Sequence, residues 1–295
     1  MSDTPAPERL AIRKTYKLYV GGKFSRSESG RSYEVRSARD GRFLANATLA
    51  SRKDGRDAVV AARSAAKGWS GATAYNRGQV LYRVAEVMEG RRTQFVADVV
   101  DGEGVKRKAA ETTVDAAIDR WVWYAGWADK IAQVEGSSNP VAGPFFAFSV
   151  PEPSGVAVVV APQRSSLLGL VSVVAPAIVA GGTCVVLASE EAPLPAVTLA
   201  EVLATSDVPG GVVNVLTGRV AEVAPWLASH GGVDVIDLAG VGDPALAAEL
   251  EAAAAETLTR VVRPAGADTD WTPDPGLARL RSHLETKSVW HPVGT

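Results

Sequence analysis

The feature that most constrains this chain is a regular alternation of short apolar runs with helical segments between residues 155 and 264. The apolar runs are rich in β-branched residues and cover 155–161, 183–188, 211–218, 233–240 and 258–264. Helical patterns lie between them, near 165–180, 195–206, 219–230 and 243–256. Near-continuous apolar strands are typical of a parallel sheet buried on both faces, and the intervening helices supply the covering layers. The sequence therefore predicts an α/β fold with a doubly wound, Rossmann-like parallel sheet.

The segments on either side of this alternation have their own patterns. Residues 1–15 read as a flexible polar arm, and the stretches KLYVGGKF and SYEVRSARDG predict short strands at Gly-Gly and Asp-Gly turns. Apolar residues at helical spacing predict helices from residue 54 onward, over about 76–100 and over about 109–133. After Pro264 the periodicity stops, and a Pro/Gly/Asp-rich linker leads to a short helix and a possible strand at 287–290.

Charge and composition narrow the class of protein. The 31 basic and 33 acidic residues are interspersed and give a formal net charge of −2, which argues against nucleic acid as a partner. We see no apolar stretch long enough to span a membrane and no signal peptide, so we expect a cytoplasmic protein without a membrane partner. One cysteine, Cys184, and three scattered histidines predict no disulfide and no metal site. Cys184 lies inside an apolar run, which predicts a buried, inert thiol.

The turn after the first of the apolar runs raises the question of function. It lies in the stretch VVVAPQRSSLLG, residues 158–169, and places Arg164 at its tip. In an open α/β sheet, ligands bind beyond the carboxyl ends of the strands. This turn is therefore expected to border a ligand site, and the role of Arg164 there needs an explanation.

Six segments of the chain together resemble the NAD(P)-binding half of aldehyde dehydrogenases. In chain order they are LYVGGKF, AVVAARSAAKGWSG, YAGWADKI, GPFFAFSVPEPSGVAVVVAP, APAIVAGGTCVVLASEEAPLPAVTLAEVL and VPGGVVNVLTG, and the closing LETKSVWHP is similar to that family's oligomerisation tail. The resemblance implies an NAD(P)-binding domain over 16–266, preceded by the arm 1–15 and carrying oligomerisation strands near 143–154. It also implies that 267–279 is a linker in place of the catalytic domain and that 280–295 is the oligomerisation tail.

The family's catalytic residues find no match here. The resemblance implies oxidation of an aldehyde through a cysteine of a second domain, but only 16 residues separate Arg263 from Leu280, too few for a domain. The family's Pro-Trp-Asn motif, whose Asn stabilises an oxyanion, corresponds to Pro162, Gln163 and Arg164. Its general-base glutamate corresponds to Pro264, which cannot accept a proton. We therefore expect no catalytic residue, and Arg164 to be a solvated or interface side chain.

The cofactor positions implied by the resemblance are only partly retained. Where the family places a lysine and a glutamate on the adenosine ribose, this chain has Leu187 and Glu190. In the family's Phe-Thr-Gly-Ser turn, Gly240 keeps the glycine while Val241 replaces the serine, and Pro244 brings no N–H to the following helix. Glu190 and Gly240 are thus the predicted cofactor contacts. We expect no cofactor, or NAD(P) bound weakly at best.

The assembly elements, by contrast, are retained. In the resembling family the strand at 143–150 and the tail pair across subunits, and the side chains expected at such an interface here are Phe145, Phe146, Phe148, Lys287, Val289 and Trp290. The sequence thus predicts a protruding β oligomerisation element and a catalytically inactive subunit, a pseudoenzyme, that assembles with itself or with a full-length aldehyde dehydrogenase. Two alternatives stay open: an NAD(P)-binding sensor module, or residual aldehyde oxidoreductase activity within a hetero-oligomer.

Overall fold

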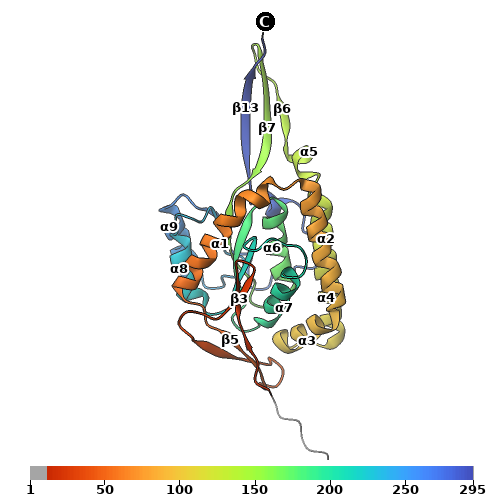
Figure 1. Cartoon of the computed structure of the whole chain (residues 1–295), viewed down its shortest axis with the longest axis vertical. Coiled ribbons are helices and arrows are strands. Elements are labelled where there is room, and N and C mark those ends of the chain that lie inside the picture. The colour runs from red at the N-terminus through yellow and green to blue at the C-terminus, as the bar shows by residue number, and fades with distance from the viewer. Residues whose placement is uncertain (1–11, 295) are drawn as a thin grey trace, which may run out of the picture.

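The computed structural model describes residues 12–294 and contains three sheets (Figure 1). The largest has seven strands in the order β12-β11-β8-β9-β10-β2-β3. Its parallel strands are β8 (Val156–Val160), β9 (Thr183–Leu187), β10 (Val213–Leu216), β11 (Val235–Asp237) and β12 (Arg260–Val262). β2 (Leu18–Val20) pairs antiparallel with β10, and a Gly21-Gly22 turn with positive φ angles joins it to β3 (Lys23–Ser25). The predicted doubly wound α/β fold is confirmed.

Each face of this sheet carries its own hydrophobic core, because successive side chains of a strand point to opposite faces. One core joins the sheet to helices on one side, which are α1 (Arg52–Gly71), α8 (Val220–Ala228) and α9 (Pro244–Ala255). The other core joins it to α2 (Ala74–Gly90), α3 (Arg92–Glu103), α4 (Arg107–Trp127), α6 (Leu168–Val179) and α7 (Leu194–Leu203). All five residues of β8 and of β9 are buried, as their unbroken apolar sequences predict.

Two of the helices predicted from periodicity are each divided in the structure. The pattern over 76–100 forms α2 and α3, which meet at Arg91 with φ −110° and ψ 12°, outside helical values. The pattern over 109–133 forms α4 and the short α5 (Ile131–Glu135), with a turn between them. Apolar spacing continues across both breaks, so periodicity alone does not reveal them.

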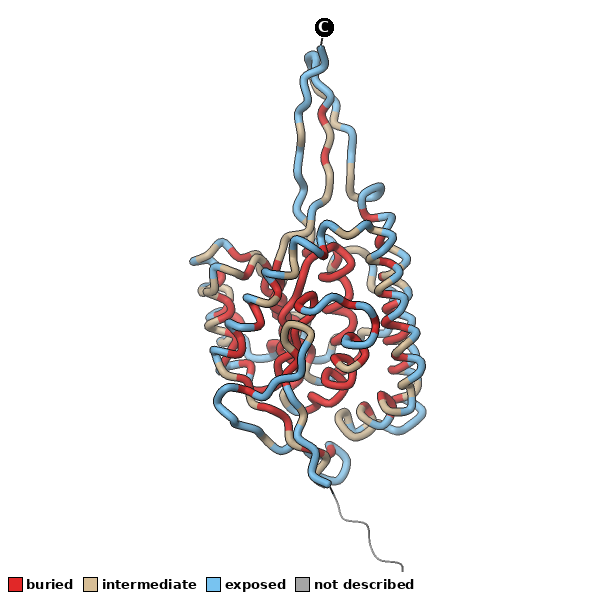
Figure 2. The backbone as a smooth tube through the Cα atoms, in the orientation of Figure 1, coloured by how far each residue is buried: buried red, intermediate tan, exposed pale blue. Residues whose placement is uncertain are grey.

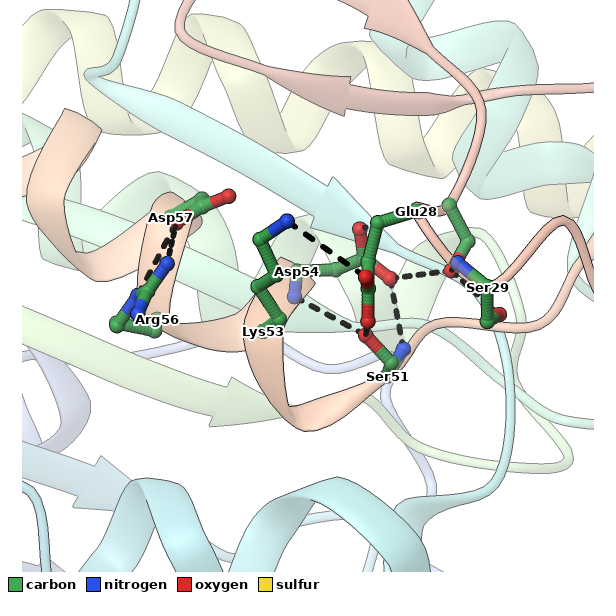
Figure 3. Close-up of polar contacts among 8 residues, drawn as sticks. Glu28, Ser29, Ser51, Lys53, Asp54, Arg56 and Asp57 are labelled. Carbon is green, nitrogen blue, oxygen red and sulfur yellow. Dashed lines mark hydrogen bonds and ion pairs between the residues drawn. The ribbon is translucent and has the colours of Figure 1, made fainter.

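Helix α1 begins with a capping box that also holds the preceding loop (Figure 3). The Ser51 side chain accepts a hydrogen bond from the Asp54 amide, and the Asp54 carboxylate accepts one from the Ser51 amide at 2.8 Å. Ser27 donates its hydroxyl to the same carboxylate at 2.6 Å. The Asp54 carboxylate thus caps the N-terminus of α1 and also anchors the loop that follows β3 through Ser27.

The N-terminal part of the chain also forms a small separate sheet. It has the order β1-β5-β4 and consists of β1 (Thr15–Tyr16), β5 (Phe43–Thr48) and β4 (Ser32–Arg36). The predicted arm 1–15 falls partly outside the described residues, since 1–11 are not among them. Thr15 belongs to β1 and pairs with Asn46, so the arm cannot extend as far as residue 15.

Three strands form an arm that projects from the body (Figure 1), and we call this sheet the β-arm. Its order is β13-β7-β6, with β13 (Leu284–Pro292), β7 (Phe145–Pro153) and β6 (Ser137–Asn139). β7 and β13 pair antiparallel along nine residues each, and most of the arm is exposed or half-buried (Figure 2). Along its length Ser149 bonds Ser288 at 2.8 Å and accepts from Asn139 at 2.8 Å.

The segment between β12 and β13 lies against the body of the protein. Arg120 of α4 donates to the carbonyl oxygens of Trp271 and Pro273 at 2.7 and 2.9 Å. The short α10 (Ala278–Arg281) follows, with Leu280 fully buried and Arg279 in an ion pair with Asp237 at the end of β11. Among residues 12–294, no helix combines the length and the apolar character that crossing a membrane requires.

Candidate functional site

A cavity of about 500 Å³ opens at the carboxyl ends of β8, β11 and β12, and we call it the strand-end cavity. Two turns and the segment after β12 line it, through Pro162, Gln163, Arg164, Ser165, Ala239, Gly240, Val241, Gly242, Gly266, Ala267, Asp268, Thr269 and Trp271. The ends of parallel strands meet at this edge, so residues far apart in the sequence converge there. The turn singled out by its sequence therefore does border a cavity.

Gln163 and Arg164, two polar residues of the turn after β8, have different surroundings. The Gln163 side chain donates to the Ala161 carbonyl at 2.8 Å and accepts from the Glu190 amide at 2.9 Å, which joins the ends of β8 and β9. Arg164 points into solvent, with 76% of its side chain exposed, and contacts Asp268 at 3.1 Å. Because Asp268 is 90% exposed as well, water screens this ion pair and it adds little stability. Arg164 is thus a solvated cation at the mouth of the cavity.

Gly240 shapes the wall of the cavity through its lack of a side chain. A Cβ built at this position would lie 1.9 Å from the Ala161 carbonyl oxygen, so the turn after β11 can approach the end of β8 only with glycine. Its amide donates to the Val160 carbonyl at 2.9 Å. The following helix starts with Asp243, whose carboxylate accepts from the Ala245 amide at 2.9 Å.

Glu190 lies away from the strand-end cavity and caps another helix. Its carboxylate accepts from the Val220 amide, at the start of α8, at 2.7 Å and from Arg219 at 3.0 Å. The Arg219 guanidinium also lies 5.5 Å from the Tyr33 ring centroid. A carboxylate at a helix N-terminus is stabilised by the helix dipole. The structure therefore does not bring the two predicted cofactor contacts, Glu190 and Gly240, into one cavity.

The single thiol of the chain is shielded from solvent. Cys184 lies in β9, fully buried, and burial raises the pKa of its thiol to about 12. Since the thiolate is the nucleophilic form, this cysteine is unreactive at neutral pH. The prediction of a buried core cysteine is confirmed.

The predicted interface residues all lie on the β-arm. Phe146 and Trp290 are 52% and 61% exposed, Phe145 packs near Trp290 with ring centroids 5.7 Å apart, and Phe146 lies 5.3 Å from Phe148. β13 adds Val289, half-buried, and Lys287, which pairs with Glu152 at 3.0 Å. The register places Phe145 and Trp290 on one face of the arm and Phe146 and Phe148 on the other, so both faces carry apolar surface in contact with water.

The sequence analysis did not predict a group of buried charged side chains that lies against the segment after β12. Asp237 is fully buried and pairs with Arg279, while Arg120 is buried on α4. The one signal available was an aspartate at the end of an apolar strand, in VDVIDLAG. Its partner comes from 42 residues further along the chain, which no local pattern indicates.

Comparison with known proteins shows which family and which proteins this chain resembles. Residues 24–271 match the model of the "Aldehyde dehydrogenase family". Cytosolic 10-formyltetrahydrofolate dehydrogenase of Mus musculus is 31% identical over 242 residues, 80% of this chain and 26% of that protein. Retinal dehydrogenase 2 of Homo sapiens is 32% identical over 241 residues, 80% of this chain and 46% of that protein. The chain therefore spans half or less of the length of these relatives.

Solved structures of similar fold agree with the family match, and they bear on the expectation about the cofactor. PnpE from Pseudomonas sp. WBC-3 is 27% identical with a TM-score of 0.79, over 85% of this chain and 50% of that one. Betaine aldehyde dehydrogenase from Staphylococcus aureus, 22% identical with a TM-score of 0.79 over 83% of this chain and 49% of that one, shares the fold and was solved in complex with NAD+.

The expectation of no cofactor, or of NAD(P) bound weakly at best, is wrong, because neighbours with this fold hold the dinucleotide. That expectation rested mainly on the replaced side chains at Leu187, Val241 and Pro244, although Glu190 and Gly240 were noted as retained. It gave too little weight to the backbone: the strand ends and the Gly240 turn still enclose a cavity.

Proposed function

The chain belongs to the aldehyde dehydrogenase family, and we propose that it serves there as a non-catalytic, dinucleotide-binding subunit that assembles through its β-arm. The observation that carries this proposal is the contrast between the shielded thiol and the exposed arm. Cys184 is fully buried with the pKa of its thiol raised to about 12, whereas the aromatic side chains of the β-arm face water. The chain offers a docking surface without an accessible thiol.

The dinucleotide would lie in the strand-end cavity. Its volume of about 500 Å³ falls in the range of small-molecule sites, and the Gly240 turn forms part of its wall. Arg164 at the mouth, with only exposed Asp268 beside it, is the cation that would face a phosphate. Glu190, the predicted ribose contact, lies outside this cavity and caps α8, so it is not part of the proposed site.

The partner would be a second copy of this chain or a full-length aldehyde dehydrogenase. Exposed apolar groups on a sheet edge are stable in solution when another chain covers them, and edge pairing gives main-chain hydrogen bonds to the partner. In the described residues the outer edge of β13 has no neighbouring strand, since β13 is the first strand of its sheet.

Assembly is tested by sedimentation velocity at micromolar concentration. We expect the wild-type chain to associate, alone or on co-expression with an active aldehyde dehydrogenase, and Phe146→Ser combined with Trp290→Ser to abolish association without loss of secondary structure. Tyr75→Ser, which removes a 67% exposed aromatic from α2, is the matched control and should associate like the wild type. A wild-type monomer in both settings would contradict the assembly role.

Catalysis and cofactor binding are tested separately on the same preparation. We expect calorimetry to show saturable binding of NAD+ or NADP+, and no NADH or NADPH to form when an aldehyde is added. Any aldehyde turnover by the purified chain would contradict the non-catalytic role, and its loss in Cys184→Ser would identify the thiol as the reactive group.

A further inference from the structure

A second, smaller cavity lies between the helices and the segment that follows β12, and we call it the linker cavity. Its volume is about 180 Å³. The walls come from α4 and α6 on one side and from residues 269–279 on the other. Because residues 264–279 are all that separate Arg263 from Leu280, this cavity exists only through the short connection that this chain makes there.

Arg120 gives the linker cavity an unusual charge. It is 6% exposed, and its described partners are all uncharged: the Ser172 hydroxyl at 2.6 Å and the carbonyl oxygens of Trp271 and Pro273. Among residues 12–294 it forms no ion pair, unlike Arg279, which Asp237 neutralises. The charge of exposed Asp274 acts on Arg120 from a distance, but no described carboxylate contacts the guanidinium. An anion in contact with this buried cation would therefore be bound favourably.

Tyr124 provides a donor on the same wall. Its side chain is completely buried, and its hydroxyl has no hydrogen-bond partner among the described residues. Burial raises the pKa of Tyr124 to about 12, so the hydroxyl keeps its proton at neutral pH. The Arg120 guanidinium has five N–H donors, and its three bonds leave two free. The closed end of the cavity therefore offers unused donors.

The two carboxylates that line the cavity lie at its exposed rim, and its remaining charged residue, Arg279, is paired with Asp237. Asp270 accepts from the Thr272 amide and hydroxyl at 2.9 and 2.7 Å, and Asp274 accepts from the Gly276 amide at 2.8 Å. Both carboxylates stabilise turns and face solvent, where water screens their repulsion. The rest of the wall is largely apolar and includes Trp271, Pro273 and Pro275.

We propose that the linker cavity binds a small monocarboxylate with an apolar body, its carboxylate accepting hydrogen bonds from Tyr124 and Arg120. A cavity of about 150 Å³ holds benzene, so the 180 Å³ found here suits a ligand of about the size of benzoate. This proposal does not rest on the dinucleotide or on assembly, because the linker cavity and the strand-end cavity share only Thr269 and Trp271.

The test uses benzoate as the probe and benzamide, which has the same shape without the charge, as its comparison. We expect calorimetry of the full chain to show benzoate binding at least about tenfold more tightly than benzamide, as charge-assisted hydrogen bonds predict. Benzoate should also raise the melting temperature of the chain by mass action. Equal binding of the two probes, or no saturable benzoate binding up to on the order of 10 mM, would overturn the proposal.

Tyr124→Phe locates the site, because it removes one hydroxyl and keeps the shape of the side chain. We expect benzoate affinity to fall about tenfold with unchanged folding. Tyr33→Phe is the matched control: it removes another buried hydroxyl without a described partner, on β4, and should leave binding intact. Arg120 is left unmutated since it also holds the segment after β12. Benzoate binding that Tyr124→Phe does not weaken would place the ligand elsewhere and overturn the assignment.

Discussion

At the scale of single residues, buried polar groups decide how this chain responds to its surroundings. His283 is fully buried directly after α10, and its Nε2 atom has no partner among the described residues. Burial lowers the pKa of His283 from 6.5 to about 3, and the cationic Arg279 and Arg260 add to that shift. The native protein therefore holds this imidazole neutral at pH values where the unfolded chain protonates it.

Acid lability follows from that difference in pKa. Above pH 6.5 neither state is protonated, and stability is lost as pH falls from 6.5 towards 3, because the unfolded state then binds more protons. Between pH 7 and pH 5 we expect the wild-type free energy of unfolding to fall by about 2 kcal/mol more than that of His283→Gln. Urea denaturation at both pH values measures this. His291→Gln, at an exposed position, should behave like the wild type, and equal losses in all three proteins would refute the prediction.

Single residues also mark the limit of what the sequence reveals about the site. Cys184 could be assigned to the core because its neighbours in the chain are its neighbours in the strand. Arg120 could not be assigned to a cavity, since its burial depends on carbonyl groups 151 and 153 residues further along. Glu190 was predicted as a ribose contact, but its carboxylate caps α8, which starts 30 residues further along the chain and which no local pattern links to Glu190.

At the scale of elements, the strands of the large sheet were predictable and the helix breaks were not. A strand buried on both faces has an apolar sequence whatever packs on it, so β8 and β9 follow from their sequences. The breaks after α2 and α4 do not interrupt the apolar spacing, so that spacing does not encode them. The close approach of α2 to α4 is visible at Gly78, where a Cβ would lie 3.1 Å from the Ala125 carbonyl oxygen.

Two glycines test this account of helix packing. Gly68 in α1 is exposed, with no atom within 4 Å of an added Cβ, so Gly68→Ala should stabilise the protein by about 0.5–1 kcal/mol through higher helix propensity. Gly78→Ala makes the same chemical change against α4 and should destabilise by about 1 kcal/mol or more. Urea unfolding compares the pair. If both variants gain stability, the contact between α2 and α4 is looser than described.

At the scale of the whole molecule, the buried pair of Asp237 and Arg279 joins the sheet to the segment that leads into the β-arm. Asp237 is completely shielded at the end of β11, and Arg279 belongs to α10, immediately before β13. Arg279 also lies 5.4 Å from the Trp271 ring centroid, in the wall of the linker cavity. One ion pair therefore couples the core, the linker cavity and the base of the arm.

Breaking this pair should be far more costly than breaking an exposed one. Arg279→Met leaves a buried carboxylate without its partner and should lower the free energy of unfolding by about 3–5 kcal/mol. Combining it with Asp237→Asn should recover part of that loss, because the uncompensated charge is removed. The control is Arg83→Met, which breaks the exposed pair with Glu86 and should cost less than about 1 kcal/mol. Additive losses in the double variant would show that the pair is uncoupled.

The shielding of the single thiol has a practical consequence. Because Cys184 is the one cysteine of the chain and is fully buried, a maleimide dye has no native thiol to reach in the folded protein. A cysteine introduced at exposed Lys287 would thus carry the label alone. Mixing donor-labelled and acceptor-labelled copies would then report, by energy transfer in real time, when two arms come together.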